Sequence, residues 1–113
     1  MVKVQGTNIY MTRGDTATIN LSIKDNRKEE YELVEGDVVV FSVKREIEDK
    51  NYVLQKAFID KQIVIEHEDT KNLDFGKYVY DIQVTFADGK VSTIITPSEL
   101  HLESEVHNSW VKR

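Results

Sequence analysis

Apolar and polar residues alternate along much of this chain, and this alternation predicts β-strands. The clearest example lies in residues 69–86, where a polar turn passes Gly76 and runs into a strand. Apolar side chains then occupy every second position, which is the period of a strand with one buried face. The positions expected to point inward are Tyr78, Tyr80, Ile82, Val84 and Phe86. We expect the rest of the chain to be organised around this strand.

Shorter segments with the same pattern predict strands at 7–12, 16–24, 38–45, 53–60, 62–66 and 98–103, with a short extended piece at 31–33. Residues 25–30 and 46–51 are charged and predict loops. The inward positions of these strands are Ala17, Ile19, Leu21, Ile23, Val39, Phe41, Val43, Ile63, Ile65, Leu100 and Leu102.

Two turns connect the later strands. Asp60-Lys61 predicts a tight turn, and Asp88-Gly89 predicts a two-residue type I′ hairpin. The expected hairpin pairs Phe86 with Val91, Val84 with Thr93 and Ile82 with Ile95. Pro97 is expected to end this ladder or to mark a sheet edge.

Seven or eight short strands without an amphipathic helix predict an all-β fold, and we expect an immunoglobulin-like antiparallel β-sandwich. A small β-barrel is the alternative. The spacing of Asp74, Gly76, Tyr78 and Tyr80 resembles the corner at which such sandwiches enter their sixth strand, with Tyr80 where antibody domains carry a cysteine. We expect residues 1–106 to form one domain and residues 107–113 to form a polar tail.

Composition excludes several classes of function. Of the 113 residues 31% are charged, with both signs interspersed and a net charge of -5, which disfavours binding to nucleic acid. The chain has no cysteine, which excludes disulfides, thiol nucleophiles and zinc–thiolate sites. No apolar run approaches the roughly 20 residues of a membrane span, and the N-terminus lacks the apolar core of a signal peptide. We therefore expect a protein that is made in the cytoplasm and does not bind membranes.

The sequence shows no motif for catalysis, and we expect neither an enzyme nor a bound cofactor or metal. His67 lies in an acidic run that we interpret as a solvated turn, because no second histidine stands at ligand spacing. His101 is expected on the exposed side of the last strand, and His107 in the tail. Asp81 is interpreted as a surface residue rather than as half of a glycosidase carboxylate pair.

Two binding motifs were weighed against structural roles. Arg13-Gly14-Asp15 is the tripeptide of some integrin ligands, but glycine suits a chain reversal here, and we expect Asp15 to cap that turn. The aromatic residues are scattered along the sequence, so a sugar-stacking platform has little support. Carbohydrate or receptor binding stays as the alternative function.

A more specific resemblance covers about residues 6–106. The chain is similar to small domains encoded among the tail and baseplate genes of phages and prophages of Gram-positive bacteria, especially the N-terminal immunoglobulin-like domain of the baseplate upper protein. The resemblance rests on Met11-Thr12-Arg13-Gly14-Asp15-Thr16-Ala17-Thr18, on Glu35-Gly36-Asp37 followed by residues 38–44, on Gly76-Lys77-Tyr78-Val79-Tyr80-Asp81-Ile82-Gln83, on Phe86-Ala87-Asp88-Gly89-Lys90 and on Ile94-Ile95-Thr96-Pro97-Ser98. The baseplate upper protein continues into a helical linker and a further domain, whereas this sequence ends at Arg113.

The resemblance implies a non-enzymatic component of the virion that docks onto other tail or baseplate proteins, and self-association is a further expectation. Contacts are expected at the strand edge near residues 7–12 and in residues 106–113. Trp110 is the main candidate anchor, because a large apolar side chain in a polar tail has few other uses. Tyr10, Arg13 and Asp15 are the other candidate interface residues.

Overall fold

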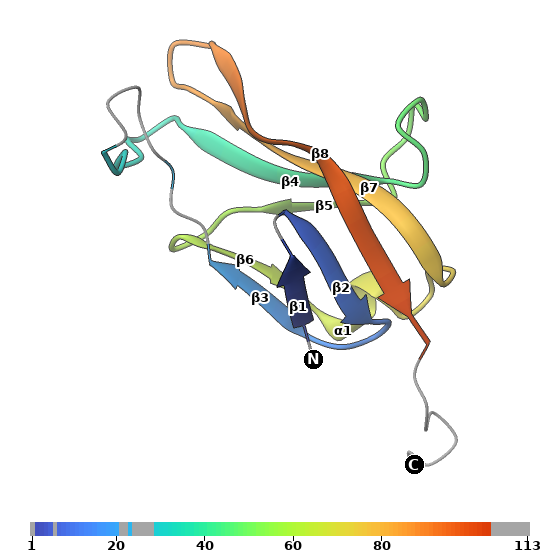
Figure 1. Cartoon of the computed structure of the whole chain (residues 1–113). Coiled ribbons are helices and arrows are strands. Elements are labelled where there is room, and N and C mark those ends of the chain that lie inside the picture. The colour runs from blue at the N-terminus through green and yellow to red at the C-terminus, as the bar shows by residue number, and fades with distance from the viewer. Residues whose placement is uncertain (1, 6, 21–22, 24–28, 105–113) are drawn as a thin grey trace.

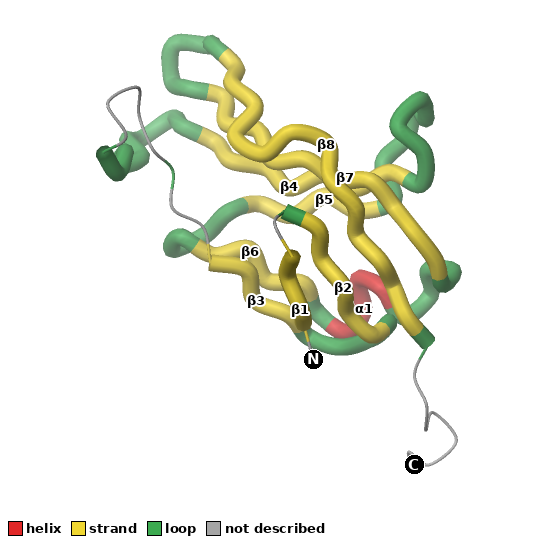
Figure 2. The backbone as a smooth tube through the Cα atoms, in the orientation of Figure 1, coloured by secondary structure: helices red, strands yellow, loops and turns green. Residues whose placement is uncertain are grey.

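The computed structural model describes residues 2–5, 7–20, 23 and 29–104, and these residues form eight strands and one helical turn (Figures 1 and 2). The elements are β1 (Val2–Gln5), β2 (Asn8–Thr12), β3 (Ala17–Asn20), β4 (Val38–Lys44), β5 (Leu54–Ala57), β6 (Gln62–Ile65), α1 (His67–Thr70), β7 (Gly76–Thr85) and β8 (Val91–Glu103).

The strands form two sheets. One has six strands in the order β1-β2-β8-β7-β4-β5, and the other consists of β3 and β6. The order β8-β7-β4-β5 facing β3-β6 is the strand arrangement of the immunoglobulin sandwich, so the predicted fold class is confirmed. One detail of the prediction was wrong: β2 and β8 run parallel, so the larger sheet is mixed rather than antiparallel. The two sheets remain separate, unlike the single closed sheet of a barrel.

Side chains from both sheets fill the space between them. Phe41, Val43, Ile63 and Ile65 are fully buried, and Tyr78 and Tyr80 are almost so. Every predicted inward residue that the structure describes lies in this core or packs against it. Leu21 lies outside the described residues. The period-2 pattern therefore gave the buried faces correctly.

Several elements differ from the prediction. β1 was not predicted, and residues 31–33 form a loop rather than an extended strand. Residues 67–70 form a single helical turn, closed at its start by a capping box in which Asp69 accepts the backbone N–H of Glu66 at 2.8 Å. β8 continues through Pro97, which lies next to an irregularity in its pairing with β7. At this point β2 has not yet joined β8, so Pro97 sits where one side of the strand needs no hydrogen bond.

The expected hairpin register was wrong by one residue near its turn. Ile82 pairs with Ile95 as predicted, but Val84 pairs with Ser92 and Thr85 with Val91. Within this turn only Gly89 has a positive φ, of 92°. The backbone N–H of Phe86 donates to the carbonyl of Lys90, as in a three-residue turn. The irregularity near Ile82 restores the predicted pair further along. The tight turn at Asp60-Lys61 is confirmed, with positive φ at both residues.

The predicted tyrosine corner is present at the start of β7. The Tyr78 hydroxyl donates a hydrogen bond of 2.7 Å to the backbone carbonyl of Asp74, four residues upstream. The Arg45 guanidinium lies 4.6 Å from the centre of the Tyr78 ring. Gly76 has a φ of 125°, which favours glycine, and it admits the Arg45 side chain closely. The corner thus fixes the direction in which β7 enters the sheet.

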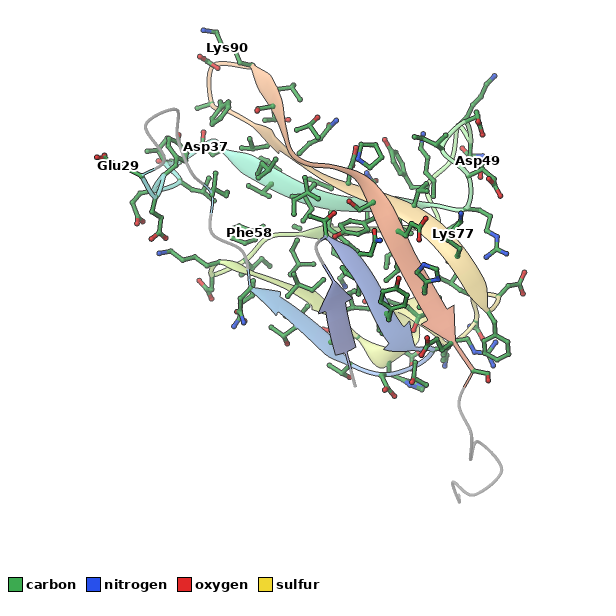
Figure 3. The ribbon with its side chains drawn as sticks, in the orientation of Figure 1. Glu29, Asp37, Asp49, Phe58, Lys77 and Lys90 are labelled. Atoms are coloured by element: carbon green, nitrogen blue, oxygen red, sulfur yellow. The ribbon has the colours of Figure 1, made fainter. Side chains whose placement is uncertain are left out.

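Asp37 joins the loop before β4 to the tip of the β7–β8 hairpin (Figure 3). Its carboxylate accepts hydrogen bonds from the backbone N–H of Val34 at 3.0 Å, the hydroxyl of Tyr31 at 2.8 Å and the backbone N–H of Ala87 at 2.9 Å. These donors lower the pKa of Asp37, with the Val34 N–H contributing most. All three favour the ionised carboxylate over the protonated acid.

A lowered carboxyl pKa predicts a loss of stability in acid. In the unfolded chain the pKa of an aspartate is about 3.9. The contribution of Asp37 to the free energy of unfolding is therefore complete above that pH and is lost as the pH falls through the lower pKa of the folded state. Asp37→Asn is expected to lower the free energy of unfolding at neutral pH, by an amount that shrinks below about pH 3.9. Urea denaturation of both proteins across this range measures the difference, and a constant difference would contradict the assignment.

Candidate docking face

The outer face of the six-stranded sheet is the candidate site, since β3 and β6 cover only its inner face. Outward positions are those that alternate with buried ones along each strand, together with their cross-strand partners. Over β5, β4, β7 from Val79 onward and the first part of β8 the outward residues are Gln55, Ala57, Val38, Val40, Ser42, Lys44, Val79, Asp81, Gln83, Thr85, Val91 and Thr93. We call this set the docking face. Its ionisable side chains, Lys44 and Asp81, both lie at one end of the face, in a chain of which 31% is charged.

Polar side chains on the docking face bond to one another. The Gln55 amide donates to the Ser42 hydroxyl at 3.0 Å, and the Gln83 amide donates to the Thr93 hydroxyl at 3.4 Å. The apolar side chains beside them stay uncovered within the described part of the chain: Val38 is 51% exposed and Val91 59%. The face therefore offers apolar and uncharged polar groups to a partner.

A hollow lies at one end of the docking face, below the loop that joins β4 to β5. It has a volume of about 90 Å³ and is lined by Ser42, Lys44, Ile47, Tyr52, Val79, Tyr80, Asp81 and Pro97. A second hollow of about 460 Å³ shares Ile47, Val79 and Pro97 with the first and continues to Thr7 and Asn8. Figure 3 shows the loop, marked by Asp49, standing beside the sheet near Lys77.

The hollow combines apolar walls with one pair of opposite charges. Ile47, the one apolar residue among residues 46–51, is 55% exposed. The Lys44 ammonium lies 5.0 Å from the centre of the Tyr52 ring. Partial burial raises the pKa of the Asp81 carboxyl, and the positive charge of Lys44 offsets part of this rise. Asp81 is thus half-buried at the sheet surface rather than fully solvated.

Charged residues border the docking face where β2, β8 and β7 meet. The Tyr10 ring stacks on His101 with 4.5 Å between ring centres, and His101 Nε2 lies 2.8 Å from Glu99 Oε1. Lys77 Nζ lies 3.7 Å from the same carboxylate. His101 first, and Lys77 second, lower the pKa of Glu99 against the effect of partial burial. Tyr10, a predicted interface residue, therefore lies on the same face of the sheet, at its charged border.

Arg13 and Asp15 lie in the turn between β2 and β3. The Arg13 guanidinium stacks 3.9 Å above the Phe75 ring and donates to the Leu73 carbonyl at 3.2 Å. Asp15 donates its backbone N–H to the Thr12 carbonyl at 3.1 Å, and Gly14 between them has a φ of 86°. The structure therefore gives this tripeptide the predicted chain reversal. Trp110, the fourth predicted interface residue, lies outside the described residues.

Thr70 holds the turn between β2 and β3 through a hydrogen bond to Gly14. Its side chain is fully buried, and its hydroxyl oxygen accepts the backbone N–H of Gly14 at 2.8 Å. Thr70→Val keeps the shape of the side chain but leaves that N–H without its acceptor, and we expect it to lower the free energy of unfolding by about 1–3 kcal/mol. Chemical denaturation measures this change.

Thr70→Ser is the matched control, since it keeps the hydroxyl and removes one methyl group, at a cost of about 0.8 kcal/mol. A Thr70→Val protein as stable as the wild type would mean that the Gly14 N–H finds another partner.

Two of the three histidines, His67 and His101, have hydrogen-bonding partners in the fold. Because a carbonyl only accepts, His67 Nδ1 donates its proton to the Gly14 carbonyl, at 2.7 Å, and His101 pairs with Glu99 as described above. His107 lies outside the described residues. Within the described ranges no three side chains of His, Asp or Glu come together as they would around a metal ion. The helix in those ranges has four residues and does not span a membrane.

Among the residues that the structure describes, the accessible aromatic rings do not form the row that sugar stacking would need. Tyr10 is stacked on His101, Tyr52 is faced by Lys44 and Phe75 by Arg13. The three rings belong to β2, to the loop before β5 and to the loop before β7. Each of these three rings is therefore occupied on one side by a neighbour from the same chain.

Comparison with protein-family models and with curated protein sequences found no match.

Four residues around the hollow were not predicted as site residues from the sequence, namely Ile47, Tyr52, Val79 and Pro97. Ile47 could have been identified, since an isolated apolar residue within a charged loop indicates a contact with another apolar surface. Val79 and Pro97 could not have been, because they meet only through the pairing of β7 with β8.

Proposed function

We propose that this chain is a non-enzymatic docking domain of a phage or prophage tail baseplate, and that it binds other virion proteins through the docking face. The observation that carries the docking role is a broad outer sheet face on which the two ionisable residues, Lys44 and Asp81, lie together at one end, in a protein otherwise rich in charge. The assignment to a tail baseplate rests on the resemblance of residues 6–106 to the N-terminal domain of the baseplate upper protein.

The layout of the face supports binding to protein. Protein interfaces have centres depleted in charged residues and rims that are polar and solvated. Here the centre is made of valine, threonine, serine and glutamine, while Lys77, Glu99 and His101 stand at one border. Exposed apolar groups of this kind stabilise a complex when a partner removes them from water, by about 25 cal/mol for each Å² buried.

The backbone of the face is held in place by hydrogen bonds, which favours binding. β7 pairs on both sides along most of its length, with β4 and with β8, so its outward side chains are held by two ladders. Less conformational entropy is lost when a preorganised surface binds. The hollow under Ile47 and Tyr52 provides a recess for one protruding side chain of a partner.

Sedimentation of tail particles tests the proposal. In a lysate of the source phage or induced prophage, the wild-type protein is expected to sediment with the tail or baseplate particles. Val40→Glu places a charge at the centre of the docking face and is expected to release the protein from the particles. Thr18→Glu, at an exposed position of β3 on the other sheet, is the matched control and is expected to stay bound.

Two results would contradict the proposal. One is a wild-type protein that is absent from the tail particles, and the other is equal retention of Val40→Glu and Thr18→Glu. The gene neighbourhood provides an independent check: flanking genes without tail, baseplate or lysis functions would remove the support for a role in the virion.

A further inference from the structure

The two hollows beside the loop between β4 and β5 form one continuous groove. They have volumes of about 90 Å³ and 460 Å³ and share Ile47, Val79 and Pro97. Along the groove Lys77, Val79 and Asp81 occupy every second position of β7, so all three stand on the outer side of the sheet. At about 3.4 Å for each residue of an antiparallel strand, they span roughly 14 Å. The groove therefore has the length of about five residues of an extended segment.

The middle of the groove is apolar. Val79 and Pro97 come together through the pairing of β7 with β8, and Ile47 reaches them from the loop. Ile47 is 55% exposed, so much of its side chain is open to a further contact. An apolar side chain of a partner placed against these three residues removes them from water, which favours binding.

The cations that line the groove already have partners within the chain. They face an aromatic ring or a carboxylate: Lys44 over Tyr52 at 5.0 Å, Arg45 over Tyr78 at 4.6 Å, and Lys77 at 3.7 Å from Glu99. A cation against the face of an aromatic ring is attracted by the negative charge of that face. The positive charges of the groove are therefore engaged by the chain itself.

The carboxylates of the groove are less well compensated. Glu46 and Glu48 are exposed on the loop, and neither forms an ion pair within the described part of the chain. Asp81 lies at the other end of the groove, where partial burial raises the pKa of its carboxyl and Lys44 offsets part of this rise. The groove therefore has uncompensated negative charge on both sides of its apolar middle.

We propose that this groove binds an extended basic segment of the partner virion protein, in which one apolar side chain lies against Ile47, Val79 and Pro97. A lysine or arginine stands two residues before that side chain and another two residues after it, because side chains of an extended segment share a face at every second position. One cation then lies near Asp81 and the other near Glu48. This inference rests on the proposed function, since it names the chemistry of the partner that docks on this face.

A peptide titration tests the proposal on the full chain alone. The probe is the capped pentapeptide Lys-Ser-Leu-Ser-Lys, followed by NMR chemical shifts of the labelled protein. We expect a dissociation constant of about 0.1–10 mM at about 0.05 M salt, with shift changes at Ile47, Val79 and Asp81. The acidic peptide Glu-Ser-Leu-Ser-Glu is expected to bind at least about tenfold more weakly, and Lys-Ser-Ser-Ser-Lys at least about threefold more weakly.

Exposed loop residues allow the charge and the apolar contact to be changed without disturbing the core. Glu48→Lys is expected to weaken binding of the basic peptide at least about threefold, and much less at about 1 M salt. Glu35→Lys makes the same change in net charge and is the matched control. It lies beside Asp37, which Figure 3 shows at the opposite end of the sheet from Asp49, and its binding is expected to equal that of the wild type. Ile47→Ser is expected to remove the preference for leucine over serine in the peptide.

Three results would overturn the proposal. They are the absence of shift changes with the basic peptide up to about 20 mM, equal binding of the basic and acidic peptides, and binding that Glu48→Lys and Ile47→Ser leave unchanged. None of these results alters the sedimentation test with Val40→Glu. A wild-type protein that is absent from tail particles would in turn contradict the proposed function alone, since the peptide titration needs no particles.

Discussion

Tyr80→Ala is expected to lower the free energy of unfolding by about 3–5 kcal/mol, the range measured for large aromatic residues truncated in protein cores. The side chain is 4% exposed and its ring centre lies 5.1 Å from that of Phe41 on the neighbouring strand. Its hydroxyl donates to the carbonyl of Thr7, which holds the segment before β2 against the start of the sheet. The truncation therefore removes core volume and one long-range hydrogen bond together. Urea or guanidinium denaturation gives the measurement.

Tyr80→Phe separates the two contributions, because it keeps the ring and removes the hydroxyl. A single hydrogen bond of this kind contributes about 0.5–1.5 kcal/mol, so the phenylalanine variant should lose only that much. A loss below about 1 kcal/mol in Tyr80→Ala would place the ring outside the core and would contradict the orientation of β7.

Tyr78→Ala is expected to cost nearly as much, about 3 kcal/mol or more, because its ring is also buried at the entry to β7. Tyr78→Phe is expected to cost about 0.5–1.5 kcal/mol through loss of the hydrogen bond to the Asp74 carbonyl. The difference between the two variants measures the stabilisation from burying the Tyr78 ring. The phenylalanine variant alone measures the stabilisation from the hydrogen bond of the corner. Equal losses in both would show that the hydroxyl alone matters, and near-neutral results in both would contradict the corner.

The buried faces were predictable from sequence because each depends on neighbours two residues away. β7 and β4 follow the alternation throughout, and Phe41 and Val43 are inward as expected. The hairpin register was less predictable. Asp88-Gly89 suits both a two-residue and a three-residue turn, and the choice depends on the irregularity near Ile82, which involves both strands. One positive φ at Gly89 decided it.

Long-range pairing was the part that local pattern did not contain. β1 consists of four residues whose pairing with β2 has no signal beyond two valines, and the parallel contact of β2 with β8 joins residues about 90 positions apart. The same limit applied to the candidate site. Residues 7–12, with Tyr10, were predicted to form an exposed strand edge, and this was wrong because β2 lies between β1 and β8. The Tyr10 ring lies on the outer face of the sheet, and its stacking on His101 follows from the parallel pairing of β2 with β8.

Asp81 illustrates how the fold changes the character of a single residue. Its alternation with Tyr80 and Ile82 placed it correctly on the outer side of β7. The loop after β4 then folds beside it, and Ile47 and Tyr52 help to enclose the hollow in which it lies. Its pKa is raised by this partial burial. The alternation along β7 determines which way Asp81 points, whereas its partial burial depends on a loop about thirty residues earlier in the chain.

Accessibility of the docking face in assembled particles tests the central claim most directly. The chain has no cysteine, so a single introduced thiol reports on one position alone. Gln83→Cys lies at the centre of the docking face, and Thr18→Cys lies at an exposed position of the smaller sheet. The account predicts that a maleimide reagent labels both thiols readily in the free protein, and that in tail particles Gln83→Cys is labelled at least about tenfold more slowly while Thr18→Cys keeps its rate. Equal labelling of Gln83→Cys in the free protein and in the particles would contradict it.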